Sequence, residues 1–484
     1  MDQHRAPLYD ALAAHARRNV HAFHVPGHKQ RAFTNEENVQ AQFECILPID
    51  LTELADTDDL HHPEGPIIEA QQLAAQCYGV EETSFLVGGS TVGNLAMILG
   101  TCESGDLLIV QRNVHKSIIH GLMLAGVQAV MLQPYIDPYS GLATVPSVNA
   151  IAEAIKHFPN AKGIVLSTPN YYGMSSNLNA IVVLAHAHQI AVLVDEAHGP
   201  HFGFHPALPH SAIQAGADVV VHSTHKMLSA MTMGAMLHMQ GELVDKSSIK
   251  QALRMVQSSS PSFPIMASID LARRQLQVEG TQALSNALEA VQMAVQALEK
   301  TSFGAVGYGV NQDRSIQYDP LKLCLYDRSA KLSGAALRDE LERRGCIAEM
   351  ADDRYVVMAF GIGSTMEDGR VLYGALLDIA KHLGEANDSK AHMPSIIDSI
   401  ATPTPIQFSR KITKHVELPL ELTVGNTSAE WVIPYPPGIP VLYPGELISA
   451  DTIVELQRWR GSRVQIQGVA DRTLQTIKVQ QSKD

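Results

Sequence analysis

The chain is poor in cysteine and contains no long apolar run. Its five cysteines are scattered without a Cys-x-x-Cys pair: Cys45, Cys77, Cys102, Cys324 and Cys346. An odd number of widely spaced cysteines indicates reduced thiols and disfavours a disulfide framework or a zinc site. No apolar stretch is long enough to span a bilayer, and the N-terminus lacks the apolar core of a signal peptide. We therefore expect a cytoplasmic protein that does not enter a membrane.

Basic residues are fewer than acidic ones. Lys and Arg number 36, Asp and Glu number 50, and the formal net charge is −14. An acidic balance disfavours nucleic-acid binding and mildly favours cationic ligands. The length of 484 residues predicts two or three domains.

From about residue 66, helix-like and strand-like segments alternate. The expected strands are 84–87, 107–110, 163–167, 190–194 and 217–221. The expected helices are 66–79, 91–100, 115–125, 148–157 and 179–188. Short apolar strands separated by helices predict a mostly parallel sheet that is covered on both faces and binds ligands at the carboxyl ends of its strands.

Composition changes predict the domain boundaries. A long helical stretch, 265–300, is suited to linking a large domain to a smaller one, and periodicity fades around 384–405. The proline-rich stretch 433–440 fits neither a helix nor a central strand. We expect three parts: an N-terminal segment plus major domain (1–300), a small α+β domain (301–385) and a C-terminal domain (386–484).

Lys226 and Asp195 stand at the ends of two expected strands. Strand 217–221 runs into His-Ser-Thr-His-Lys226, and strand 190–194 ends in Asp195-Glu-Ala-His. In pyridoxal phosphate enzymes a lysine forms the Schiff base, and a carboxylate pairs with the protonated ring nitrogen. We therefore predict a pyridoxal phosphate site. Taken singly, Lys226 also fits an exposed strand-end lysine and Asp195 a helix cap.

Two further segments support such a site. Gly-Gly-Ser90-Thr91 follows strand 84–87 and opens a helix, whose free N–H groups and dipole favour phosphate. Alone, this segment equally fits a glycine-rich turn with an ordinary Ser/Thr cap. His115 follows strand 107–110, where it can stack on a cofactor ring; its position alone favours a histidine at a helix start, capped by Asn113.

The 22 histidines raise the question of a metal site. His24 and His28 are four residues apart, but Pro26 and Gly27 break the helix that would align them. Glycine and proline also interrupt the histidines within 198–205. We therefore expect no structural or catalytic metal.

Together, these motifs resemble the fold-type I, pyridoxal-phosphate-dependent ornithine/lysine/arginine decarboxylases of bacteria. The segments that carry the resemblance are 23–29, 50–54, 58–63, 89–94, 112–117, 195–199, 223–226, 258–263 and 435–440. They cover most of the chain. The resemblance implies an α/β large domain of the aspartate aminotransferase type with a mostly parallel sheet, followed by a small α+β domain and a C-terminal domain.

The resemblance also implies roles for single residues. Lys226 carries the cofactor, Asp195 holds its ring nitrogen, His115 stacks on the ring, and Ala197 packs beneath it. The residues implied to bind phosphate are Ser90, Thr91, Ser223 and His225. Glu446 is implied to bind the substrate's distal cation. A homodimer with shared active sites is implied, with Ser259 and Ser260 near the partner's site.

Two features depart from the large inducible members of that family. Those members carry an N-terminal wing domain, which we do not expect here, so a dimer or a small multiple is favoured over a decamer. They also carry an aromatic residue at the position of His198. A histidine agrees better with the shorter, constitutive type, and His198 and Lys226 are both candidates for returning a proton to Cα.

We therefore expect α-decarboxylation of lysine, arginine or ornithine, which yields CO2 and a diamine or agmatine. One alternative is another reaction on this fold, such as transamination or β-elimination. Aminotransferases of this fold grip the α-carboxylate with a small-domain arginine, and no such residue is identifiable among Arg314, Arg328, Arg338, Arg343, Arg344 and Arg354. A second alternative is a catalytically silent homologue.

Overall fold

The protein is described here from a computed structural model. The structure describes residues 1–18, 20–31, 34–308, 313, 315–383, 404–411, 414–435, 438–460 and 465–481. In this part of the chain, no helix combines the length and apolar character needed to cross a membrane.

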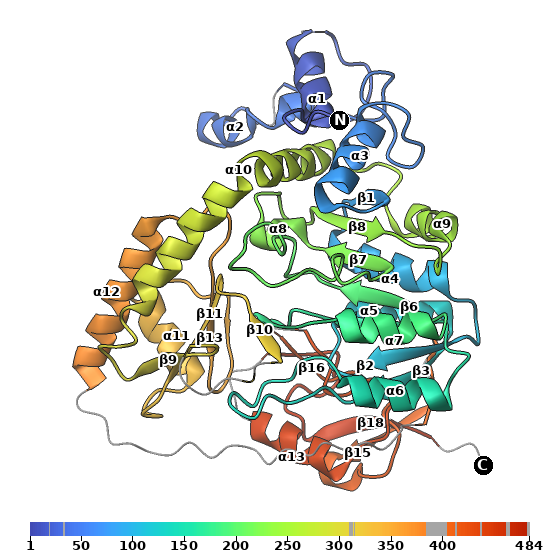
Figure 1. Ribbon diagram of the computed structural model, residues 1–484, viewed down its shortest axis with the longest axis vertical. Helices are drawn as coiled ribbons and strands as arrows, with labels where there is room; N and C mark the ends of the chain where they lie inside the picture. Colours follow the sequence, from blue (N-terminus) through green and yellow to red (C-terminus); the bar gives the residue numbers. More distant parts are fainter. Residues whose placement is uncertain are drawn as a thin grey trace.

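The core of the molecule is an eight-stranded sheet in the order β1-β8-β7-β6-β4-β2-β3-β14 (Figure 1). Its strands are β1 (Glu82–Leu86), β2 (Leu107–Gln111), β3 (Gln128–Leu132), β4 (Gly163–Ser167), β6 (Ala191–Asp195), β7 (Val219–His222), β8 (Ala235–Met239) and β14 (Ile406–Gln407). β3, β2, β4, β6 and β7 are parallel, whereas β8 is antiparallel to β1 and β7, and β14 is antiparallel to β3. The carboxyl ends of the parallel strands and of β1 therefore meet at one edge.

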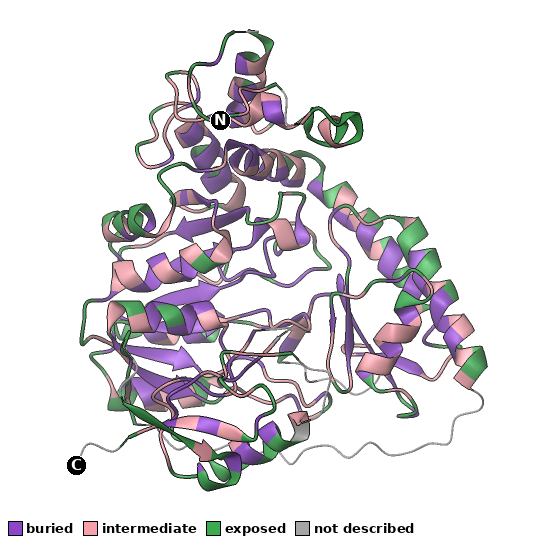
Figure 2. Ribbon diagram, turned by 180° about the vertical axis from the view of Figure 1, so that it is seen from behind, coloured by how far each residue is buried: buried purple, intermediate pink, exposed green. Residues whose placement is uncertain are grey.

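Helices cover both faces of this sheet, which is why most residues of its strands other than the edge strand β14 are buried (Figure 2). The helices are α3 (Pro66–Tyr78), α4 (Gly89–Thr101), α5 (Lys116–Ala125), α6 (Val148–His157), α7 (Asn179–Ala187), α8 (Thr224–Met227) and α9 (Lys246–Val256). α4, α5 and α9 share one apolar core with the sheet, and α6 and α7 share another. A Cβ on Gly93 would lie 2.8 Å from side-chain atoms of Leu86 and Val221. This glycine therefore lets α4 lie directly on β1 and β7.

One long helix, α10 (Phe263–Val295), leads from the large domain to the small one (Figure 1). The small domain has an antiparallel sheet in the order β12-β13-β11-β9. Its elements are β9 (Phe303–Ala305), β11 (Lys322–Asp327), α11 (Gly334–Glu342), β12 (Met350–Ala351), β13 (Val356–Ala359) and α12 (Met366–Leu383). A short ladder between β10 (Ile316–Tyr318) and β5 (Met174–Ser176) ties this region to the large domain.

The N-terminal segment packs on α10 through buried polar contacts. It contains α1 (Pro7–Arg17), α2 (Glu37–Phe43) and the 3-10 helix η1 (Leu47–Ile49). Asp270 of α10 accepts a hydrogen bond from the Leu8 N–H at 3.0 Å and forms a fully buried ion pair with Arg273. Because the acid and the base satisfy each other and the backbone, the charges remain tolerable inside the protein.

The C-terminal region forms a compact module that also reaches into the large domain. Its elements are β15 (His415–Pro419), η2 (Leu420–Leu422), β16 (Ile433–Tyr435), α13 (Ala450–Trp459), β17 (Gln465–Gln467) and β18 (Thr476–Gln480). Phe408 and Tyr443 belong to the core of the large sheet, which β14 completes. The predicted boundary between residues 385 and 386 lies outside the described residues. So do Pro436 and Pro437 of the proline-rich stretch 433–440. The three-part division therefore stays a prediction.

Candidate active site

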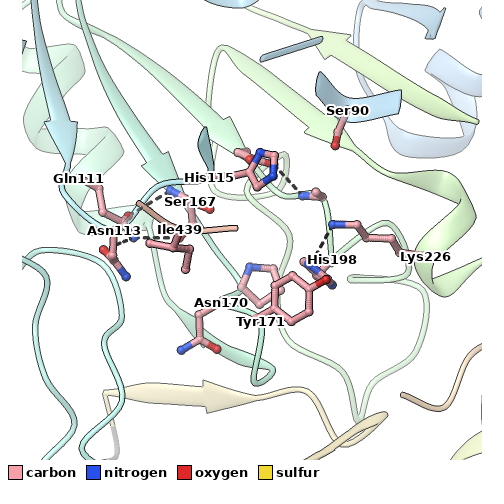
Figure 3. Close-up of a pocket in the computed structure, with 13 residues that line it drawn as sticks. Ser90, Gln111, Asn113, His115, Ser167, Asn170, Tyr171, His198, Lys226 and Ile439 are labelled. Carbon is pink, nitrogen blue, oxygen red and sulfur yellow. Dashed lines mark hydrogen bonds between the residues drawn. The ribbon is translucent and has the colours of Figure 1, made fainter. Parts of the chain in front are cut away.

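A pocket lies at the carboxyl edge of the large sheet, where the sequence placed the candidate site (Figure 3). Six of the predicted residues line it: Ser90, His115, Asp195, Ala197, His198 and Lys226. Seven further residues, none of them predicted as a site residue, complete it: Gln111, Asn113, Ser167, Pro169, Asn170, Tyr171 and Ile439. Thr91, Ser223, His225 and Glu446 are not among the lining residues.

Lys226 and His198 form a hydrogen-bonded pair in this pocket. Lys226 Nζ lies 2.9 Å from His198 Nε2, and the His198 ring meets Tyr171 edge-on at 4.4 Å between centroids (Figure 3). Burial lowers the pKa of Lys226 to about 8, although Asp195 acts in the opposite direction. Burial and the charge of Lys226 hold the pKa of His198 well below its ordinary value. The pair therefore provides an amine that loses its proton readily, which a nucleophilic lysine requires.

Asp195 is held in a buried hydrogen-bond network. Its carboxylate accepts hydrogen bonds from Asn94 Nδ2 at 2.8 Å and the Ala197 N–H at 3.2 Å. Asn94 Nδ2 also lies 2.9 Å from Ser117 Oγ, which is 2.8 Å from His115 Nδ1. Burial raises the pKa of Asp195, and Lys226 and the hydrogen bonds act against that effect. A buried carboxylate fixed in this way suits a protonated ring nitrogen as its partner.

His115 is neutral and fixed in orientation. It caps α5, and its Nδ1 accepts a hydrogen bond from the Ser117 N–H at 3.3 Å. Burial and then the charge of Lys226 lower the pKa of His115 to about 3. An uncharged imidazole held by two hydrogen bonds is suited to stacking on an aromatic ring.

The predicted phosphate residues come from two segments that a short loop brings together. Ser90 lies in the first turn of α4, and the Gly89 N–H donates to the Met233 carbonyl at 2.9 Å. The His225 N–H donates to the next carbonyl, that of Gly234, at 3.1 Å. The start of α4 and the segment before Lys226 therefore flank the same loop, as phosphate binding at a helix N-terminus requires.

Two hydroxyls of this region are buried and have no hydrogen-bond partner among the described residues. They are Ser223 Oγ and Thr224 Oγ1. Buried hydroxyls in proteins are nearly always hydrogen-bonded, so these donors call for a ligand. His225 Nδ1 is already bonded to the Gly234 carbonyl at 2.9 Å, while Thr91 is exposed. The free hydroxyls, the helix terminus, the buried carboxylate and the readily deprotonated amine together fit pyridoxal phosphate.

Glu446 lies in a clamp between the C-terminal module and the large domain. Arg112, which follows β2, donates from Nε and Nη2 to the two carboxylate oxygens of Glu446, each at 2.7 Å. The same guanidinium donates to the carbonyls of Pro440 and Val441 at 2.8 Å and lies 4.5 Å from the ring centroid of Tyr443. This clamp adjoins Ile439, which lines the pocket. A substrate-binding role for Glu446 stays a prediction.

Several lining residues were not predicted, although their positions carry a signal. Asn170 and Tyr171 follow the end of β4, at the same sheet edge as Asp195 and Lys226. Gln111 ends β2, and its side chain exchanges hydrogen bonds with the backbone of Ser167 at 3.0 and 3.2 Å. A search for polar residues just after each expected strand would have identified Gln111, Asn170 and Tyr171.

The small domain contributes two charged residues that no sequence motif indicated. Lys322, at the start of β11, is only 4% exposed, and its Nζ lies 5.6 Å from the ring centroid of Tyr171. Glu349 accepts a hydrogen bond from the Tyr171 hydroxyl at 3.2 Å. Lys226 Nζ lies 5.7 Å from the same ring centroid. Tyr171 therefore connects the predicted site to the small domain.

Comparisons with known proteins identify the family of this chain. A family model described as the Orn/Lys/Arg decarboxylase major domain matches residues 6–307, and one for the C-terminal domain of the same family matches residues 397–471. An uncharacterized protein of Bacillus subtilis, YaaO, is 40% identical over 470 residues, which are 96% of each chain. An arginine decarboxylase of Bacillus subtilis is 34% identical over 486 residues, 99% of this chain and 98% of that protein.

Solved structures show the fold. The lysine decarboxylase LdcF of Francisella novicida aligns with a TM-score of 0.81 at 20% identity, covering 98% of this chain and 81% of that one. A structure of SPT with a PLP internal aldimine aligns with a TM-score of 0.51 at 18% identity, covering 65% of this chain and 76% of that one. The predicted fold-type I α/β class is confirmed. With two family models matched in order and relatives similar over nearly its full length, the chain belongs to the Orn/Lys/Arg decarboxylase family.

Proposed function

We propose that this protein catalyses the pyridoxal-phosphate-dependent α-decarboxylation of a basic L-amino acid, and that arginine is its substrate. The observation that carries the proposal is the pairing of a fixed, buried Asp195 with a readily deprotonated Lys226 in one pocket. Similarity over nearly the full length to an arginine decarboxylase supports arginine. Lysine and ornithine are the alternatives that the family allows.

Several residues of the pocket have separate roles in the proposed reaction. Pyridoxal phosphate, when bound, supplies an electron sink for the pair left at Cα as CO2 departs. Asp195 would accept a hydrogen bond from its protonated ring nitrogen, and His115 would cover its ring. Lys226 would hold the cofactor through its nucleophilic amine. His198 Nε2 exchanges a proton with Lys226 Nζ, and either atom can return a proton to Cα.

We assign the substrate's distal cation to the side of the pocket where Glu349 lies. Its carboxylate accepts a hydrogen bond from Tyr171, and Tyr171 lines the pocket. A carboxylate at this point attracts a guanidinium or ammonium group. Glu446, which the family resemblance implies for this role, has both oxygens occupied by Arg112.

We also propose that the enzyme is a cytoplasmic homodimer with shared active sites. Large apolar side chains are exposed at Phe23 (95%), Val25 (65%), Met231 (43%) and Met233 (47%). Met233 lies beside Gly89 at the start of α4, so this one exposed apolar residue adjoins the pocket. Five free thiols favour a reducing compartment.

Sedimentation tests the dimer. The wild type is expected to sediment as a dimer at micromolar concentration, whereas Phe23→Asp, which removes an exposed anchor without disturbing the core, shifts the mass toward a monomer and lowers activity. A fully active wild-type monomer contradicts the proposal. The location is checked by cell fractionation, and recovery in the membrane or secreted fraction contradicts it.

The main experiment measures CO2 release from arginine, lysine and ornithine by the reconstituted enzyme. Arginine is expected to be the best substrate, and Lys226→Ala is expected to lose both turnover and the cofactor's absorption band. Lys156→Ala, which removes an exposed lysine on α6, is the matched control and keeps both. Keto acid formation without CO2 release would identify a transaminase, and an absent absorption band would identify a silent homologue.

A further inference from the structure

Lys322 is a buried lysine for which the reaction described above has no role. Its side chain is 4% exposed and makes no hydrogen bond or ion pair with any described residue. Moving an ammonium group out of water without a paired carboxylate is unfavourable, and such lysines concentrate at functional sites. A methionine would fill the same space without that cost. The buried charge therefore requires an explanation.

The position of Lys322 places its charge next to the reacting groups. Lys322 Nζ and Lys226 Nζ lie 5.6 and 5.7 Å from the centroid of one ring, that of Tyr171. His198 packs against the same ring at 4.4 Å and is hydrogen-bonded to Lys226. Three basic groups thus surround one side chain, and like charges at such range oppose one another's protonation.

The local backbone is shaped to admit the Lys322 side chain. Gly173 has φ +84°, and a Cβ there would lie 2.4 Å from Lys322 Cβ. The nearby carboxylate of Asp319 is taken, because one oxygen lies 3.1 Å from His201 Nε2 and the other accepts the Leu321 N–H at 3.0 Å. The fold therefore brings a lysine into the site while its nearest acid is bonded elsewhere.

We propose that Lys322 is a positioning residue whose ammonium group favours loss of a proton from the Lys226–His198 pair, so that Lys226 is more readily a free amine when the cofactor arrives. This inference rests on the proposed function. The charged and titratable groups around Lys322 are Asp319 before β11, Glu349 before β12, Tyr171 after β4, His198 after β6 and Lys226 in α8.

The directions of the pKa shifts of Lys226 and Lys322 are consistent with this proposal. Burial lowers the pKa of both lysines, and the charge of Lys322 lowers that of Lys226 further. Glu349 acts to raise the pKa of both lysines, Asp319 acts to raise that of Lys322, and Asp195 acts to raise that of Lys226. The charge of Lys322 therefore lowers the pKa of Lys226 against the effect of two carboxylates, Asp195 and Glu349.

The test measures the titration of Lys226 in the apoprotein, so it does not depend on activity. Lysine reactivity toward acetic anhydride is followed by mass spectrometry from pH 6 to pH 11. In Lys322→Met the titration midpoint of Lys226 is expected to rise by about one pH unit. In Lys322→Arg, which keeps the charge, and in Lys156→Met, an exposed control, it stays at the wild-type value.

A Lys226 midpoint in folded Lys322→Met equal to that of the wild type overturns the proposal. The wild type offers a second test if that variant does not fold, because Lys226 must become reactive at a lower pH than Lys322. The reverse order also overturns it. Absence of CO2 release combined with a shifted Lys226 midpoint refutes the proposed function and leaves the electrostatic role intact.

Discussion

Replacing Glu446 with alanine tests whether its carboxylate is structural. The Arg112 guanidinium and the Glu446 carboxylate are only 13% and 18% exposed and share two hydrogen bonds of 2.7 Å. The change leaves Arg112 with the two carbonyl acceptors and the Tyr443 ring, but without the carboxylate that is hydrogen-bonded to it. Removing one partner of a buried ion pair costs about 3 kcal/mol. With a urea dependence of about 1.5 kcal/mol per molar, the unfolding midpoint of the C-terminal module falls by about 2 M.

The chain offers a fluorescent probe for this measurement. Its two tryptophans are Trp459, at the end of α13, and Trp431, whose ring meets that of His120 of α5 edge-on at 5.1 Å, so their fluorescence reports on the C-terminal module and on its contact with the large domain. The double variant Arg112→Met, Glu446→Met is expected to recover part of the loss, because no charge is left unpaired. An unchanged urea midpoint in Glu446→Ala, accompanied by a raised KM for the amino acid, refutes the clamp. It would support the implied substrate role of Glu446.

Four further outcomes are expected. Asn94→Leu removes a hydrogen bond to the Asp195 carboxylate and weakens cofactor binding by about tenfold, as an absorbance titration would show; equal affinity contradicts the network. The imidazole of His115, whose pKa is about 3, shows no NMR titration between pH 5 and 9. The pKa of Lys226 is lowered from 10.5 in the unfolded chain to about 8 in the folded protein. Between pH 8 and pH 10.5 the unfolded chain therefore binds more protons than the folded one, and the free energy of unfolding of the apoprotein rises with pH. Urea unfolding at pH 7 and pH 10 checks this, since Lys226→Met should stabilise the apoprotein more at pH 7. Gly173→Ala meets a 2.4 Å contact at φ +84° and lowers the thermal midpoint, whereas an unchanged midpoint contradicts the close packing.

The parallel sheet and the two central residues of the site were predictable because they depend on local pattern. Asp195 and Lys226 follow apolar strands, and chain direction alone brings such strand ends to one edge. β8 was not predicted because His238 interrupts its apolar run. In the folded chain His238 is buried, and Thr83 and His222 satisfy its ring nitrogens at 2.9 and 3.1 Å.

The remaining features of the site depend on contacts between distant segments. Arg112 and Glu446 are 334 residues apart, and no local pattern pairs them. Lys322 stands at the start of an apolar strand, where the sequence alone indicates an ordinary exposed lysine. The space for its side chain depends in part on Gly173, which lies about 150 residues earlier in the chain. Tertiary contacts of this kind override what spacing and composition indicate.

The place of β14 in the sheet has a consequence for how the protein is made. The strand that closes the β3 edge pairs Ile406 with Ala129, so the large sheet remains open on one side until the ribosome has synthesised a further 277 residues. An uncovered strand edge is a template for pairing with other chains. The nascent catalytic domain is therefore aggregation-prone for most of its synthesis, and a fragment that ends before residue 404 would keep that exposed edge permanently.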